Sequence, residues 1–188
     1  MSRVGVLVFP GTNCEFDVVE AVRNQGGEAE LIWHGDSSLP AVDALVVPGG
    51  FAHGDYLRPG AIAQFSPIMK PLRDFAERGG PVIGICNGFQ VLTEAGLLPG
   101  ALQKNAGLKF LCKPTKVRVE STNSALTSAA SHGQVLDIPI NHFEGNYTCD
   151  DETLRELRDD DRIVLTYVDN PNGSVADIAG VCNAGRNV

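Results

Sequence analysis

Short, unbroken runs of apolar residues recur through the first half of the chain, and segments of helical composition lie between them. Such runs, rich in β-branched residues, are typical of strands that are buried on both faces of a sheet. The intervening helical segments fit the crossover connections that parallel strands require. We therefore expect strands at 4–9, 29–33, 44–47 and 81–85, and helices after Asn13, over 61–78 and over 87–95.

Capping and breaking residues set the expected ends of these helices. Asn13 is a good N-cap for the first helix, and the glycine pair at 26–27 is expected to stop it. Pro67 and Pro71 are expected to break or kink the segment 61–78, because proline lacks the N–H that a helix interior needs. The alternation of strands and helices predicts an α/β fold, doubly wound around a mostly parallel sheet.

The second half of the chain is less regular, and no repeat, low-complexity stretch or linker divides it from the first half. A single domain over residues 1–188 is the simplest interpretation. The segment 116–120 alternates between polar and apolar residues, which suits an edge strand. Further strands are expected at 135–140, 163–168 and 175–181, with a charged helix near 151–158.

The composition is that of an ordinary globular protein. Of the 188 residues, 43% are hydrophobic and 20% are charged, and a chain of this length buries roughly 70% of its unfolded surface. The formal net charge of −8 argues against a binder of nucleic acid or of an anionic membrane, since both favour a basic surface. No apolar segment resembles a membrane span or a signal peptide, so a cytoplasmic location with reduced thiols is expected.

Five cysteines are spread widely along the chain, and none belongs to a C-x-x-C pair. Neither a zinc site nor a thioredoxin-type redox pair is therefore predicted. Widely spaced thiols in a cytosolic protein are usually small buried hydrophobes, so a chemical role has to come from the local sequence. The five are Cys14, Cys86, Cys112, Cys149 and Cys182.

Cys86 has such a local context, because it lies in the sequence G-I-C-N-G, at 84–88, where an apolar run passes directly into a helix. A nucleophile on a sharp strand-to-helix turn needs small residues two positions before and after it, since larger side chains would clash. The turn places the sulfur at a helix N-terminus, which favours the thiolate, and the backbone N–H of Asn87 beside a developing oxyanion. A buried cysteine in a tight turn is the alternative.

A second glycine motif, Gly49-Gly50, follows the expected strand at 44–47. Its N–H groups can point into a site at the carboxyl edge of the sheet and, with Asn87, complete an oxyanion hole. The alternative is an ordinary turn. Cys14 also begins a helix after a strand, but it lacks the flanking glycines and is the weaker candidate nucleophile.

A cysteine nucleophile usually needs a histidine base, and the chain has four histidines. His142 follows a strand and has Glu144 two residues later, so it is the best candidate within the chain for a base with an orienting carboxylate. A loop histidine with structural hydrogen bonds is the alternative. The other three are His34, His53 and His132.

Together these motifs resemble those of the class I glutamine amidotransferases, whose nucleophile motif is G-x-C-x-G-x-Q. More closely, the chain is similar to one branch of that family, the glutaminase subunits of phosphoribosylformylglycinamidine synthase. The resemblance extends over essentially the whole chain and implies a flavodoxin-like fold. Its motifs are F-P-G-T-N-C-E at 9–15, P-G-G-F at 48–51, G-D-Y-L-R-P-G at 54–60, G-I-C-N-G-F-Q at 84–90 and D-N-P-N-G-S at 169–174.

The resemblance implies an activity and a set of site residues. Cys86 would attack the side-chain amide of glutamine, form a thioester and release ammonia, and water would then yield glutamate. Gly50 and Asn87 would form the oxyanion hole. No cofactor or metal is expected in this subunit. The substrate-binding residues would be Gly49, Gly88 and Gln90.

The resemblance also implies partners. Ammonia would pass to a large synthetase subunit, which uses ATP and magnesium to convert formylglycinamide ribonucleotide to its amidine in purine biosynthesis. A small subunit would bridge the complex, and neither nucleic acid nor a membrane is an expected partner. The loop 51–60, with Asp55, Tyr56 and Arg58, is expected to border the active site and to sense the synthetase.

One segment of the family has no counterpart here. The base and its orienting glutamate lie in a P-H-P-E segment after the last strand of the family, and the sequence ends at Val188 before it. We expect that the C-terminal end of the domain is missing and that these 188 residues alone have little glutaminase activity. In the family, the segment matching 142–145 lies near the substrate. A stand-alone α/β cysteine hydrolase and a non-catalytic scaffold subunit are the alternative functions.

Overall fold

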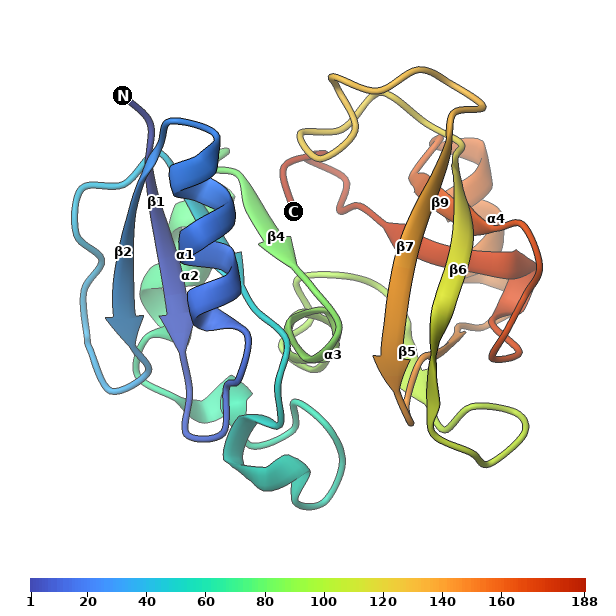
Figure 1. Cartoon of the computed structure of the whole chain (residues 1–188), viewed down its shortest axis with the longest axis horizontal. Coiled ribbons are helices and arrows are strands. Elements are labelled where there is room, and N and C mark those ends of the chain that lie inside the picture. Colours follow the sequence, from blue (N-terminus) through green and yellow to red (C-terminus); the bar gives the residue numbers. More distant parts are fainter. The chain divides into compact units, whose positions relative to one another are not determined.

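The computed structural model describes residues 1–188, which pack into two compact units. One unit consists of Met1–Leu97 and Asn187–Val188, and the other of Leu98–Arg186. Figure 1 shows the elements of both, coloured along the chain. This grouping does not test the expectation of a single domain over 1–188, which stays a prediction.

The first unit is built on a four-stranded parallel sheet with the order β2-β1-β3-β4. The chain order reverses between β1 and β3, which is the kind of switch point where α/β sheets bind ligands. The predicted α/β fold with a parallel sheet is confirmed in this unit. The strands are β1 (Arg3–Val8), β2 (Glu28–Trp33), β3 (Ala44–Val47) and β4 (Val82–Gly84).

Helices cover both faces of this sheet, and Figure 1 shows α1 in front of it and α2 behind it. Right-handed crossovers require this arrangement, because the β1–β2 and β3–β4 connections run in opposite directions across the sheet. The helices are α1 (Glu15–Asn24), α2 (Met69–Glu77) and α3 (Asn87–Glu94), with short 3₁₀ segments η1 (Ala52–Asp55) and η2 (Ala63–Phe65).

The apolar runs of the sequence form the core of the first unit. Val6 and Leu7 of β1 are fully buried, and Leu45 of β3 is 1% exposed. Each such side chain contributes roughly 1.5–3 kcal/mol on burial. The runs are unbroken because both faces of the parallel sheet are covered.

Two of the predicted helix features are wrong. Pro67 does lie in a break between η2 and α2, but Pro71 is the third residue of α2 and does not break it. N–H groups in the first turn have no partner within the helix, so proline is tolerated there. The N-cap of α1 is Cys14 rather than Asn13, whose backbone N–H instead donates to Gly49 O at 3.2 Å.

The second unit is antiparallel, so the expected parallel sheet is confined to the first unit. Its main sheet has the order β10-β9-β6-β7, and β5 pairs separately with β8. Since β6 lies between β9 and β7, the prediction of an edge strand at 116–120 is wrong. The elements are β5 (Ala101–Gln103), β6 (Leu111–Val119), β7 (Val135–His142), β8 (Asn146–Thr148), α4 (Asp151–Asp159), β9 (Ile163–Tyr167), η3 (Val175–Asp177) and β10 (Ile178–Val181).

Local conformation sets two element ends in the second unit. Asp150 caps α4 by accepting a hydrogen bond from Thr153 N at 2.8 Å. Ala176 and Asp177 have positive φ, 50° and 58°, which is incompatible with an extended strand. The strand expected over 175–181 therefore begins only at its fourth residue.

The last residues of the chain belong to the first unit. Asn187 O accepts a hydrogen bond from Val82 N at 2.7 Å, at the edge of β4. The Asn187 side-chain amide donates to Ala76 O and Gly80 O, both at 2.8 Å. The first bond satisfies a backbone N–H on the outer edge of β4, and the other two satisfy carbonyls in α2 and in the segment between α2 and β4.

Candidate active site

Cys86 occupies the turn between β4 and α3, at the carboxyl end of the sheet. Its φ of 53° and ψ of −108° lie in a region that residues with a side chain rarely adopt. A conformation of this kind costs on the order of 1–3 kcal/mol and often marks an active site. Cys86 is exposed and is the N-cap of α3, so it lies where a helix stabilises an anion.

Two glycines around Cys86 are required by the lack of space. A Cβ on Gly88 would overlap the carbonyl oxygen of Val47, the last residue of β3. A Cβ on Gly84 would lie 2.5 Å from Leu92 Cδ1 and 2.7 Å from the Gly88 backbone. Helix α3 therefore packs so close to β3 and β4 that only glycine fits at positions 84 and 88. This is the steric reason expected from the sequence for the G-x-C-x-G spacing.

The Gly49–Gly50 turn lies beside Cys86. A Cβ built on Gly49 would be 3.7 Å from Cys86 Cβ. Gly50 has a φ of 151°, and a Cβ there would be 2.6 Å from Asn13 N. The fold thus brings the two glycine motifs together at the carboxyl ends of β3 and β4, where an oxyanion hole for Cys86 would have to form.

A turn over residues 10–14 holds the backbone of this glycine pair. The N–H groups of Asn13 and Cys14 donate to Gly49 O at 3.2 and 3.1 Å. Sequence reasoning used this segment as a family motif and as a helix start, and it missed the contact. Only the motif's unusual length signalled a function, because bonds between backbones of distant turns leave no residue pattern.

Cys14, the rival nucleophile, lies on the other side of Gly49. Its sulfur would be 3.4 Å from a Cβ built there. Burial raises the pKa of the Cys14 thiol, and the carboxylates of Asp17 and Glu15 raise it further. A thiol that stays protonated is a poor nucleophile, so its surroundings agree with the lower rank given to Cys14.

Asn87 and Gln90, two of the predicted site residues, lie in the first turn of α3 and are 2% and 5% exposed. Asn87 Nδ2 donates to Gln90 Oε1 at 2.8 Å. Sequence reasoning considered only the backbone N–H of Asn87. The role of its side chain was missed because no sequence pattern marks an amide as buried.

Three of the histidines have hydrogen-bond partners that fit a structural role. His34 Nδ1 and His53 Nε2 in the first unit both contact Ser66 Oγ, at 3.1 and 3.3 Å. Burial lowers the pKa of His34, and the neighbouring His53 lowers it further. In the second unit, His132 Nδ1 lies 2.7 Å from Glu120 O.

His142, the best sequence candidate for a base, is the last residue of β7 in the second unit. Both of its ring nitrogens are buried without a hydrogen-bond partner, so Glu144 does not orient the ring. Burial lowers the pKa of His142 and raises the pKa of Glu144. The suggested pair of a base with an orienting carboxylate is therefore not formed.

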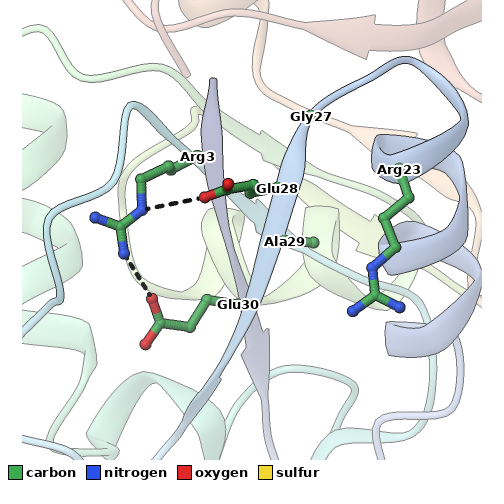
Figure 2. Close-up of a pocket in the computed structure, with 6 residues that line it drawn as sticks. All are labelled: Arg3, Arg23, Gly27, Glu28, Ala29 and Glu30. Carbon is green, nitrogen blue, oxygen red and sulfur yellow. Dashed lines mark ion pairs between the residues drawn. The ribbon is translucent and has the colours of Figure 1, made fainter. Parts of the chain in front are cut away.

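A cavity of about 350 Å³ lies at the opposite end of the parallel sheet from Cys86, at the amino ends of β1 and β2. Arg3 lies there, 3.8 Å from Glu28 and 3.6 Å from Glu30. Figure 2 marks both ion pairs with dashed lines. Arg23 comes from α1 on the other side of β2, and its guanidinium lies apart from that of Arg3. Because the two cations do not converge, this cavity offers no second candidate site.

The family model described as a CobB/CobQ-like glutamine amidotransferase domain matches residues 1–188. The chain belongs to this glutamine amidotransferase family. It is 55% identical to the phosphoribosylformylglycinamidine synthase subunit PurQ of Koribacter versatilis, over 99% of this chain and 85% of the relative. It is also 55% identical to the PurQ subunit of Rubrobacter xylanophilus, over 99% of this chain and 84% of the relative. These identities place the amidotransferase among the PurQ subunits.

A solved structure named PurLQS, from Thermotoga maritima, superposes on the amidotransferase chain with a TM-score of 0.91 at 41% identity. The match covers 100% of this chain and 85% of the other. It confirms the expected class I glutamine amidotransferase fold. None of the helices has the length and apolar character needed to cross a bilayer, and no three His, Cys, Asp or Glu side chains gather as metal ligands.

Proposed function

We propose that the chain is the glutaminase subunit of phosphoribosylformylglycinamidine synthase, with Cys86 as its nucleophile. The observation that carries the proposal is the strained turn at Cys86 with the Gly49–Gly50 turn packed beside it. The identity of 55% to PurQ subunits, over 99% of the chain, supports the same assignment. A non-catalytic scaffold role would not explain the strained backbone of Cys86.

The proposed reaction begins when the Cys86 sulfur attacks the side-chain carbonyl carbon of glutamine. The carbonyl oxygen takes up the negative charge and accepts hydrogen bonds from the backbone N–H groups of Asn87 and Gly50. The C–N bond then breaks, the nitrogen takes up the proton that the Cys86 thiol has lost and leaves as ammonia, and a γ-glutamyl thioester remains. Water adds to the thioester, the C–S bond breaks, and glutamate and the thiol are released.

Three further residues are proposed to bind the substrate. Gly49 has no side chain beside Cys86, where a Cβ would lie 3.7 Å from the Cys86 Cβ, and this leaves room for glutamine. Gly88 lets the first turn of α3 pack against Val47 and so reach the substrate. Gln90 is held by Asn87, and this contact supports a fixed direction for its amide. The proposed steps use no cofactor or metal in this subunit.

Ammonia released at Cys86 would pass to a large synthetase subunit, where ATP and magnesium support conversion of formylglycinamide ribonucleotide to its amidine. The similar structure from Thermotoga maritima is named PurLQS rather than PurQ alone, which supports a complex with a synthetase. A small bridging subunit and a cytoplasmic location belong to the same proposal.

Alkylation by an electrophile that mimics glutamine tests the proposed function. Cys86 should be labelled selectively, and glutamine should protect it, as intact mass and peptide mapping would show. Cys14 is an internal control, because its labelling should be slow and independent of glutamine. Labelling of Cys86 that glutamine does not affect would contradict the glutaminase proposal and favour a stand-alone hydrolase or a scaffold.

A further inference from the structure

The loop Phe51–Gly60 follows the Gly49–Gly50 turn and has an unfavourable backbone. His53, Asp55 and Leu57 have positive φ values of 54°, 54° and 70°. Each is an uncommon conformation for a residue with a side chain and persists only where other contacts fix it. Leu57 is 89% exposed, so packing of its own side chain does not hold the loop.

The Asn87 side chain supplies the central contact. Its Oδ1 accepts a hydrogen bond from Ala52 N at 2.9 Å, and its Nδ2 donates to Asp55 Oδ1 at 3.1 Å and to Gln90 Oε1 at 2.8 Å. One acceptor and two donors are therefore in use within a residue that is 2% exposed. A carboxylate cannot reproduce this set, because it has no donor.

The far end of the loop is held against the same helix. Arg58 Nε and Nη2 donate to the two carboxylate oxygens of Glu94, both at 2.6 Å. A Cβ on Gly60 would lie 2.7 Å from the backbone of Gln90 and Val91, so the loop backbone touches α3 directly. The loop is thus fastened to α3 at both of its ends, and Asn87 is the contact nearest the nucleophile.

We propose that the Asn87 side chain is a positioning residue for glutamine hydrolysis, an inference that rests on the proposed function. The same residue gives its backbone N–H to the oxyanion and its side chain to the loop. Because the side chain is tied to Ala52 and Asp55, it fixes the plane of the Cys86–Asn87 peptide and with it the direction of that N–H. An oxyanion donor acts mainly in the transition state, so loss of the tie lowers kcat more than it raises KM.

Exchanging the amide of Asn87 and the carboxylate of Asp55, singly and together, tests this inference. In Asn87→Asp, carboxylates stand at both 87 and 55. For the complete subunit in its complex with the synthetase, kcat for glutamate release should then fall about 10- to 100-fold. In Asp55→Asn the amide oxygen still accepts the bond, so the loss should be smaller. In the double variant N87D/D55N, the amide at position 55 donates to the carboxylate at position 87, so the bond between the two residues is restored in the opposite direction. This variant should recover most of the lost kcat.

Asn24→Asp, at the exposed end of α1, is the matched control: it adds the same charge away from the loop and should leave kcat unchanged. Thermal unfolding shows which variants fold. If Asn87→Asp does not fold, Asp55→Ala decides, because alanine cannot accept the bond and its kcat should lie below that of Asp55→Asn.

Equal kcat for the alanine and asparagine variants at position 55 would overturn the inference. So would a double variant that folds without recovering kcat, since the added charge alone would then explain the loss in Asn87→Asp. A Cys86→Ser variant that still releases glutamate at the normal rate would overturn the proposed function instead. The two failures are therefore distinguishable within one set of proteins.

Discussion

The backbone of Cys86 is strained, and the residues that permit it contribute no side chain. Gly84 and Gly88 let α3 approach the sheet, and Gly49 leaves space next to the cysteine. This part of the candidate site could be predicted from the sequence, because a clash with Cβ is a local rule of the strand-to-helix turn. The role of the Asn87 side chain could not be predicted, since it depends on a loop that folds over it.

At Gly88 an added methyl group should damage both packing and chemistry. Gly88→Ala forces α3 away from the Val47 carbonyl, so the free energy of unfolding should fall by about 1–3 kcal/mol and glutaminase kcat by about 100-fold. Gly107→Ala is the control, because nothing lies within 4 Å of a Cβ there. Urea unfolding and glutamate release measure the two effects; similar values for both variants would contradict the steric argument.

Glu120 in the second unit should make stability depend on pH. The hydrogen bond from Thr166, followed by the contacts of Arg118, lowers the pKa of Glu120 below its ordinary value of 4.5. A carboxyl group whose pKa is lowered in the folded state stabilises the protein at pH values above its ordinary pKa. This contribution is lost as the pH falls through the lowered pKa.

Glu120→Gln should therefore lower the free energy of unfolding by about 1 kcal/mol at neutral pH. The difference from the parent protein should shrink as the pH falls below 4.5, the ordinary pKa of the group. Urea titrations at several pH values measure it. A difference that stays constant with pH would show that lost packing, rather than charge, is responsible.

Among the elements, those with local start and stop signals were predicted best. The strand at 44–47 matches β3 residue for residue, because Pro48 and two glycines end the apolar run. The position of β6 inside its sheet was predicted wrongly, since its partners β7 and β9 come later in the chain and pairing across such distances has no local pattern. Alternation predicts a strand with one buried face and says nothing about its neighbours.

The turn over residues 10–14 holds the Gly49–Gly50 turn and the residue after it. Thr12 bridges to Gly50, and Phe51 N donates to Gly11 O at 2.8 Å. Gly11 has a φ of 91°, and a Cβ there would overlap the Phe51 carbonyl. Gly11→Ala should therefore displace the Gly49–Gly50 turn.

We expect Gly11→Ala to lower glutaminase kcat by about 10-fold. Gly26→Ala is the matched control: its φ of 78° is equally unfavourable for alanine, but nothing lies within 4 Å of the added atom. It should lose about 1 kcal/mol of stability and no kcat. Unfolding and steady-state kinetics on both variants measure this; equal kcat in the two would count against a holding role for the turn.

At the scale of the whole molecule, the parallel half followed from apolar runs and crossover helices, whereas the antiparallel half did not. The strands of the antiparallel half alternate between polar and apolar residues. This pattern predicts which side of each strand is buried, but it does not predict the order of the strands in the sheet. Recognition of the family depended on several motifs that occur in the same order, and the match over residues 1–188 confirms it. The predicted site residues Gly49, Cys86, Asn87 and Gln90 all lie in the first unit.

The loop Phe51–Gly60 should matter for transfer of ammonia to the synthetase. The Arg58–Glu94 pair is partly exposed, so Arg58→Ala should cost at most about 1 kcal/mol of stability. Glutamine-dependent synthesis of the amidine should fall more than synthesis supplied with free ammonium, as assays of the complex would show. Lys70→Ala removes another exposed ion pair and is the control. Equal losses in both assays would refute the coupling role.

The first unit is discontinuous in the sequence, and this affects the order in which it can form. Val82 N of β4 can form its hydrogen bond only after Asn187 has been added to the chain. The side chain of the same asparagine bonds to Ala76, 111 residues earlier. A ribosome that has released residues 1–97 has therefore not yet supplied the groups that cover the outer edge of this sheet. Until translation reaches position 187, the outer edge of β4 is unpaired and can pair with a strand of another nascent chain. Self-association during synthesis is therefore expected mainly in this interval.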